Sequence, residues 1–330
     1  MALKSPQGIN CRCFWQLIVI AAICLMPATR TWAAPPRVGT FPERQITMLV
    51  AYAPGGKMDL EARALAMQLK KYLGVSVIIQ NVPGANGRLG LTKLYRSKPD
   101  GYVIGGITIP NIQLVEVMSK AEFRSNDFTK IFAWSANNAS LAVPVDKWNS
   151  LEEFVSAGKA KTLSCGISGI GGSAHLAGLI LEATLGLKFN WVPFNSGAEA
   201  AAALAGKHID AATVSTASIL PLQRAGRVKA LVILAQERDQ TMPEIPVPNE
   251  LGYKYAAIPS VNGVAGPPGL AAAKVKLLEA AFAKAAKEPE FIAWAKRTGT
   301  ELDMKNSRTL EKLTEDMTRE VVKYSHLLGK

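Results

Sequence analysis

The residue types best suited to catalysis are few in this sequence of 330 residues, and they are far apart. The three histidines, His175, His208 and His326, never fall within one helical turn of each other, so no metal-binding spacing is present. Residues 166–170 (GISGI) lack the final glycine of the G-x-S-x-G turn of serine hydrolases. We therefore expect no catalytic residues, no metal site and no enzymatic activity.

A glycine-rich segment at 169–174 (GIGGSA) matches the G-x-G-x-x-[GA] pattern of dinucleotide-binding loops. The strand expected next, at 188–192, is not followed by the acidic residue that would bind a ribose, so the sequence argues against NAD and we expect no cofactor. A glycine loop before a helix has a more general use. Its free amides and the helix N-terminus favour a small anion.

Three loops share this arrangement, namely Gly55 with Gly56, residues 171–173, and residues 195–197. Each loop precedes an expected helix. A single glycine loop can equally be a tight turn with no ligand. Three similar loops favour a ligand site, provided that the parts of the protein that carry them face each other.

Four side chains near these loops have alternative roles. Lys57 opposes the dipole of its helix, a position that an anion would make favourable, although a solvent-facing lysine is also possible. Asp59, in the first helical turn, suits capping better than ligand contact, and His175 suits a structural hydrogen bond better than ligand contact. Cys165 lies in an apolar run and is expected to be buried and unreactive.

Two stretches of the chain repeat the order strand, glycine loop, helix, which predicts two βαβαβ halves. Because βαβ connections are right-handed and bury their strands, each half should form a parallel sheet covered by helices. A carboxyl-terminal helix with an apolar stripe should pack on the first lobe. The expected strands are residues 45–53, 75–80, 102–107, 162–167, 188–192 and 208–214, and the three final helices are 271–287, 289–298 and 307–328.

The chain is expected to cross between two lobes twice, because 330 residues usually exceed one core. An apolar strand at 140–145 and an N-cap at Ser150 mark the first crossing, and the second lies near 229–235. The predicted first lobe comprises residues 34–143 plus 236–330. The predicted second lobe comprises residues 144–235.

Residues 1–33 have the pattern of a secretory signal peptide, with Lys4 and Arg12 before the apolar stretch 17–26. Ile23 stands where a lipoprotein signal needs a small residue, so no lipid anchor is expected. Three of the four cysteines lie in this leader, which leaves no intramolecular disulfide. We expect a soluble, monomeric periplasmic protein that does not bind nucleic acid and whose charge, +12 for the whole chain, favours an anionic ligand.

Six motifs then occur in order along the rest of the chain: YAPGG at 52–56, NVPGANG at 81–87, PDGY at 99–102, SGIGGSAHLAG at 168–178, VPF at 192–194 and GPPG at 266–269. Together they resemble the periplasmic substrate-binding proteins of tripartite tricarboxylate transporters, the Bug or TctC family. The resemblance implies a two-lobed α/β periplasmic binding protein, type II-like, that closes on a small organic carboxylate in a cleft. It also implies delivery to the membrane subunits of a tripartite tricarboxylate transporter.

The same resemblance implies which positions contact the ligand. Those in the first loop are Tyr52, Ala53, Gly55 and Gly56, and those in the second lobe are Ser168, Gly172, Ser173, Asn195, Ser196, Gly197 and Ala198. A sensing or scavenging receptor without a dedicated permease remains an alternative, and a periplasmic enzyme is a weaker one.

Two positions differ from many family members. Lys57 replaces Ser or Thr, and we expect it to donate to the ligand carboxylate. Val214 replaces an Asp, so the strand end with Ser215 offers apolar and hydroxyl groups only. An ammonium would find no partner there, which predicts a carboxylate without an amine, with an apolar or aromatic body near Val214 and Val261.

Overall fold

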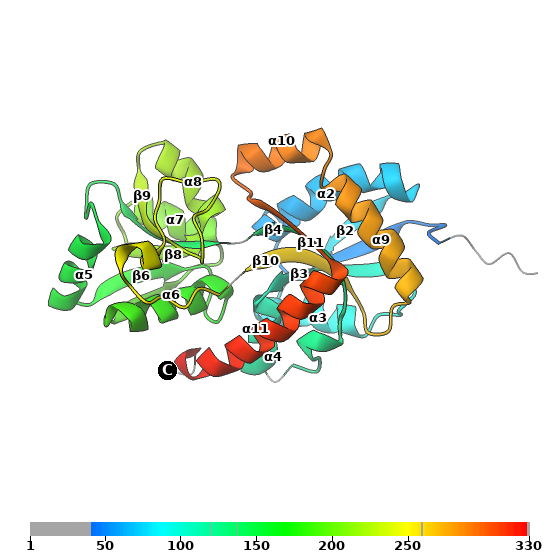
Figure 1. Cartoon of the computed structure of the whole chain (residues 1–330), viewed down its shortest axis with the longest axis horizontal. Helices are drawn as coiled ribbons and strands as arrows, with labels where there is room; N and C mark the ends of the chain where they lie inside the picture. Colours follow the sequence, from blue (N-terminus) through cyan, green and yellow to red (C-terminus); the bar gives the residue numbers. More distant parts are fainter. Residues whose placement is uncertain (1–40, 120, 137, 259, 329–330) are drawn as a thin grey trace, which may run out of the picture. The chain divides into compact units, whose positions relative to one another are not determined.

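Two β-sheets covered by helices make up the part of the chain that the structure describes, residues 41–119, 121–136, 138–258 and 260–328 (Figure 1). The structure is a computed structural model. The predicted leader at 1–33 lies outside the described residues. Within the described ranges, no helix combines the length and apolarity needed to cross a membrane.

The first sheet has six strands in the order β11-β4-β10-β3-β1-β2. Its strands are β1 (Ile46–Val50), β2 (Val77–Asn81), β3 (Val103–Ile109), β4 (Thr129–Ala136), β10 (Val261–Gly266) and β11 (Leu302–Asn306). The second sheet has five strands in the order β7-β6-β8-β5-β9. Its strands are β5 (Ala139–Pro144), β6 (Leu163–Ile167), β7 (Phe189–Pro193), β8 (Ala211–Ser215) and β9 (Val228–Leu234).

Both sheets are mixed, which corrects the prediction of parallel sheets. The predicted strands β1, β2 and β3 do pair in parallel, as do β6, β7 and β8. The antiparallel pairs of the first sheet involve β4, β10 and β11, which the sequence patterns did not predict. In the second sheet, β5 is antiparallel to both β8 and β9.

Ten α-helices and three short 3-10 helices lie among the described residues. They are α2 (Lys57–Leu73), α3 (Arg88–Tyr95), α4 (Asn111–Ser119), α5 (Leu151–Ala160), α6 (Ser173–Leu185), α7 (Gly197–Ala205), α8 (Thr216–Arg224), α9 (Ala272–Ala285), α10 (Pro289–Thr298) and α11 (Ser307–Leu328), with η1 (Ala85–Gly87), η2 (Ser125–Asp127) and η3 (Pro248–Leu251). The predicted N-cap at Ser150 is confirmed, because its side chain accepts from the Glu153 amide. The helix α2 ends at Gly74, whose φ of 71° is left-handed.

The first sheet has an apolar cluster on each face, and the side chains of β1 alternate between the two clusters. Ile46, Met48 and Val50 pack with α2 and α9, whereas Leu49 belongs to the cluster that includes α3, α4 and α11. Strand geometry explains this division, because successive side chains point to opposite faces. The helix α11 packs on β4 and α4, as predicted, and also on α6 of the second sheet.

The first crossing between the sheets lies earlier than predicted. Strand β5 pairs with β8 and β9, so residues 139–143 belong to the second sheet and not to the first lobe. The chain therefore crosses between β4, which ends at Ala136, and β5, which begins at Ala139. Two residues, Asn137 and Asn138, separate the strands, and asparagine favours a turn.

Candidate functional site

The first loop, between β1 and α2, is held by Asp59. Its carboxylate accepts a 2.9 Å hydrogen bond from the amide of Gly55, the residue just before the N-cap Gly56 of α2. Arg63 and Asn81 also donate to it, at 3.1 and 2.9 Å. Burial alone would raise the pKa of Asp59, but these donors, Arg63 first, outweigh burial and lower it. Asp59 thus fixes the loop as an ionised group, with Gly55 exposed beside it.

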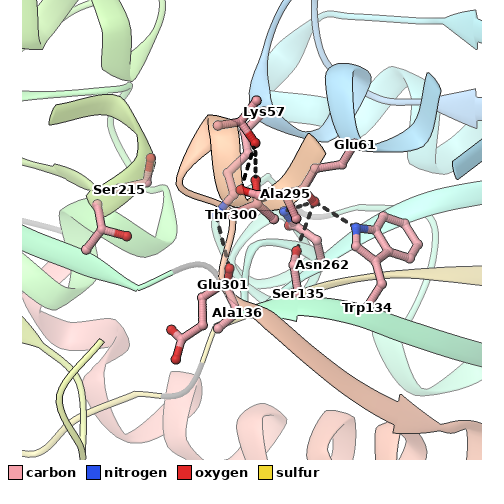
Figure 2. A network of polar contacts seen from close by, with 12 residues as sticks. Lys57, Glu61, Trp134, Ser135, Ala136, Ser215, Asn262, Ala295, Thr300 and Glu301 are labelled. Carbon is pink, nitrogen blue, oxygen red and sulfur yellow. Dashed lines mark hydrogen bonds and ion pairs between the residues drawn. The ribbon is translucent and has the colours of Figure 1, made fainter. Parts of the chain in front are cut away.

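The anion expected near Lys57 is present within the protein itself, as the carboxylate of Glu61. Its Nζ donates to the Ala136 carbonyl at 3.0 Å and lies 3.8 Å from Oε1 of Glu61 (Figure 2). Glu61 is fully buried. The other oxygen, Oε2, accepts from Trp134, Ser135 and Asn262 at 2.8 to 2.9 Å. A lysine opposing the helix dipole is therefore balanced from within the protein.

The second loop precedes α6 and is stabilised by His175. The ring Nδ1 accepts from the Gly171 amide at 3.0 Å, so the predicted structural role is confirmed. Burial lowers the pKa of His175 to about 4, and the ring packs edge-on against Trp191 with centroids 5.0 Å apart. The imidazole is neutral at physiological pH. It therefore adds no positive charge to the loop.

The third loop precedes α7, and its own side chains cap the start of that helix. The Ser196 hydroxyl accepts from the Glu199 amide at 3.1 Å, and the Glu199 carboxylate accepts from the Asn195 amide at 3.0 Å. Sequence reasoning missed Glu199, although a serine followed three residues later by a glutamate is the sequence pattern of a capping box. The first turn of this helix thus already holds a carboxylate of its own.

The end of β8 lies beside the third loop, because a Cβ at Gly197 would be 3.7 Å from the Cβ of Val214. Val214, near which an apolar ligand body was predicted, is fully buried in the core of the second sheet. Val261 is likewise buried, at 2% exposure. The Ser215 hydroxyl is half-buried and hydrogen-bonded to that of Ser218 at 2.8 Å. Cys165 is buried as predicted, and burial raises its pKa to about 12.

Asn111 joins the first and second loops, and sequence reasoning missed it. Its Oδ1 accepts from the Ser173 amide at 2.6 Å, and its Nδ2 donates to the Tyr52 hydroxyl at 3.4 Å. Asn111 follows the carboxyl end of β3, the edge where ligand-binding residues gather in α/β sheets, and that position was the available signal. Nearby, Asn86 donates to the Ile170 carbonyl at 3.5 Å.

The structure leaves most predicted contact positions partly accessible. The exposed positions are Ala53, Gly55, Ser168, Asn195 and Ala198. The half-buried positions are Tyr52, Gly56, Lys57, Gly172, Ser173, Ser196, Gly197 and Ser215. Asp59, His175 and Val214 are buried. Among the described residues, no three His, Cys, Asp or Glu side chains gather as metal ligands. The loops thus present accessible backbone and hydroxyl groups, although the amides of Gly55, Gly171, Ser173 and Asn195 already donate within the protein.

Comparison with known proteins identifies the family. The family model described as the tripartite tricarboxylate transporter family receptor, TctC, matches residues 61–326. This chain belongs to the TctC family. A UPF0065 protein of Bordetella pertussis is 32% identical over 86% of this chain and 87% of its own length. Protein BugT of the same organism is 29% identical over 73% and 76%.

Solved structures of the TctC type share the two-lobed α/β fold. A TctC solute-binding protein from Polaromonas, without ligand, is 29% identical, with a TM-score of 0.74 over 88% of this chain and 99% of that one. MatC from Rhodopseudomonas palustris, with bound malate, is 26% identical, with a TM-score of 0.77 over 87% and 100%. The periplasmic binding protein BugD is 26% identical, with a TM-score of 0.75 over 86% and 99%.

Proposed function

We propose that this TctC-family chain is a periplasmic receptor that binds a small organic carboxylate between its two lobes without chemical change. It would deliver that ligand as a monomer to the membrane subunits of a tripartite tricarboxylate transporter. The observation that carries the proposal is the first loop, an exposed glycine turn at the start of α2 that the buried Asp59 holds in place through the Gly55 amide. A preorganised loop at a helix start binds an anion without an ordering cost.

The ligand class follows from the acidic side chains at the three loops. At the first loop the Asp59 carboxylate is already paired with Arg63, so it is not free to balance a ligand ammonium. A ligand ammonium enclosed there would lack a counter-ion, which costs several kcal/mol. We infer a carboxylate without an amine. The malate bound by the MatC relative supports a carboxylate ligand for this fold.

Thermal-shift measurements, followed by calorimetry, test the binding step. The panel comprises succinate, malate, adipate, benzoate and terephthalate, with aspartate and glutamate as amine-bearing controls. A ligand at a hundred times its dissociation constant should stabilise the fold by about 2.7 kcal/mol and raise the melting temperature. We expect the preferred acid to bind at least a hundredfold tighter than either amino acid. Flat melting curves throughout would refute carboxylate binding, and tighter binding of an amino acid would refute the ligand class.

Delivery needs a separate test, because a sensing or scavenging receptor would share the binding step. Uptake of the bound acid into vesicles that contain the tripartite transporter's membrane subunits should require the loaded receptor. Tight binding with no stimulated uptake would favour the sensing or scavenging alternative. Turnover of the bound acid in the purified protein would favour the enzyme alternative.

A further inference from the structure

The helix α6 begins without a cap of its own. Its N-cap residue is Gly172, which has no side chain, whereas α5 and α7 are capped by Ser150 and Ser196. The first amides of a helix have no partner within the helix, so another group must accept from them. For the Ser173 amide that group is Oδ1 of Asn111, at 2.6 Å.

Asn111 reaches α6 from the other sheet. It is the first residue of α4, and β3, which precedes α4, belongs to the first sheet, whereas α6 follows β6 of the second. The same side chain amide donates to the Tyr52 hydroxyl at 3.4 Å. One half-buried asparagine therefore connects the residue that opens the first loop with the start of α6.

We propose that Asn111 is a positioning residue that holds the two lobes together in the absence of ligand by capping α6 across the lobe boundary. This bond can form only while α4 and the start of α6 are adjacent, so it favours the closed arrangement over an open one. The inference rests on the proposed function only in that closure precedes ligand transfer. A neutral hydrogen bond of this kind changes the ratio of closed to open molecules by about two- to tenfold.

Three variants separate the parts of the contact. Asn111→Ala removes the acceptor. Ser173→Pro removes the amide donor and leaves Asn111 in place, because proline is favoured at the first helical position and Gly172 already has the extended backbone (φ −83°, ψ 169°) that a following proline requires. Asn111→Asp keeps an acceptor and adds a negative charge at the helix start, which strengthens the bond.

Spin-label distances in the ligand-free protein measure closure, with labels on Lys70→Cys of α2 and Lys159→Cys of α5, both exposed. We expect Asn111→Ala and Ser173→Pro each to lower the closed-to-open ratio two- to tenfold, and the double variant to lower it no further. Asn111→Asp should raise the ratio. Melting temperatures verify that each variant is folded.

Unchanged distances in Asn111→Ala, or additive effects in the double variant, would overturn the proposal. Calorimetry adds a second readout. A change in closure lowers the affinity for every carboxylate by the same factor, whereas the loss of a direct ligand contact would lower the affinity for some carboxylates more than for others. The distance measurement needs no ligand, so it stands even when no carboxylate binds. Conversely, if the protein binds a carboxylate but the spin-label distances are unaltered in Asn111→Ala, the positioning role of Asn111 is refuted and the proposed function still holds.

Discussion

Glu61 is the residue on which the environment of Lys57 depends. Its carboxylate is fully buried, accepts three hydrogen bonds through one oxygen, and has the ammonium of Lys57 3.8 Å from the other. A buried carboxylate that loses its counter-charge is strongly unfavourable. Lys57 therefore has a stabilising role that exists without ligand, and a ligand contact would be an addition to it.

Replacing Lys57 with methionine should destabilise the ligand-free protein. We expect Lys57→Met to lower the free energy of unfolding by roughly 1 to 3 kcal/mol in urea titrations, because Glu61 is left without a cation. The double variant Lys57→Met with Glu61→Gln should recover most of this loss. Unaltered stability in the single variant would show that the pair contributes nothing.

The same variant tests the proposed ligand contact of Lys57. A charge-assisted hydrogen bond of about 1.5 to 3 kcal/mol corresponds to roughly ten- to a hundredfold in affinity. Calorimetry at a temperature where Lys57→Met remains folded should therefore show that loss for the preferred carboxylate. Equal affinity in variant and parent protein would restrict Lys57 to its contacts with Ala136 and Glu61.

Between elements, the close approach of α3 to β1 fixes where the first loop begins. A Cβ at Gly90 of α3 would lie 2.7 Å from the Cα of Ala51 and 2.8 Å from the Val82 carbonyl oxygen, and both are backbone atoms that cannot turn aside. Ala51 immediately precedes the loop residue Tyr52. Glycine at position 90 thus sets the distance between this helix and the strand that carries the loop.

Gly90→Ala should destabilise the protein by roughly 1 to 3 kcal/mol, because the added methyl group forces α3 away from β1. Thermal and urea unfolding measure this, and Lys93→Ala, an exposed change on the same helix, serves as the matched control with an effect near zero. The carboxylate affinity of Gly90→Ala should also fall, as the displaced strand moves the loop. If Gly90→Ala were as stable as Lys93→Ala, the prediction would be wrong, because α3 would then move away from β1 with no loss of stability.

For the molecule as a whole, a pair of carboxyl groups lies where the chain passes between the sheets. Asn138, at the first crossing, donates to Asp239 at 3.2 Å and to Glu301 at 2.6 Å. Glu301 directly precedes β11 and also accepts from the Gln240 amide. Burial, followed by the charges of Asp239 and Asp303, raises the pKa of Glu301 to about 7.

This raised pKa predicts a pH dependence of stability. Between the usual glutamate pKa of about 4.5 and about 7, the folded protein retains a proton that the unfolded chain has lost, so this contribution is complete below pH 4.5 and is lost as the pH rises through 7. After allowance for solvent screening of a half-buried group, roughly 1 to 2 kcal/mol is expected. Glu301→Gln should remove that slope in urea titrations from pH 5 to pH 8. An equally steep slope in both proteins would contradict the assignment.

Local pattern by itself determined much of this protein: the parallel strands, the glycine loops, the three final helices, the cap at Ser150, the buried Cys165 and the structural role of His175. Each depends on periodicity, φ preference or capping within a few residues, so neighbouring sequence contains the information. The repeated βαβαβ order and the chain length also predicted two lobes, and the family resemblance added the ligand class.

Only the tertiary structure decided which distant groups meet. Asn111 bonds Ser173 across 62 positions, Lys57 bonds Ala136 across 79, and Glu61 bonds Asn262 across 201. These partners depend on the insertion of β10 between β3 and β4 and on the pairing of β5 with the second sheet. Apolar strands of similar composition can pair in several orders, and the choice among them rests on packing of the whole chain, which no local window of sequence specifies.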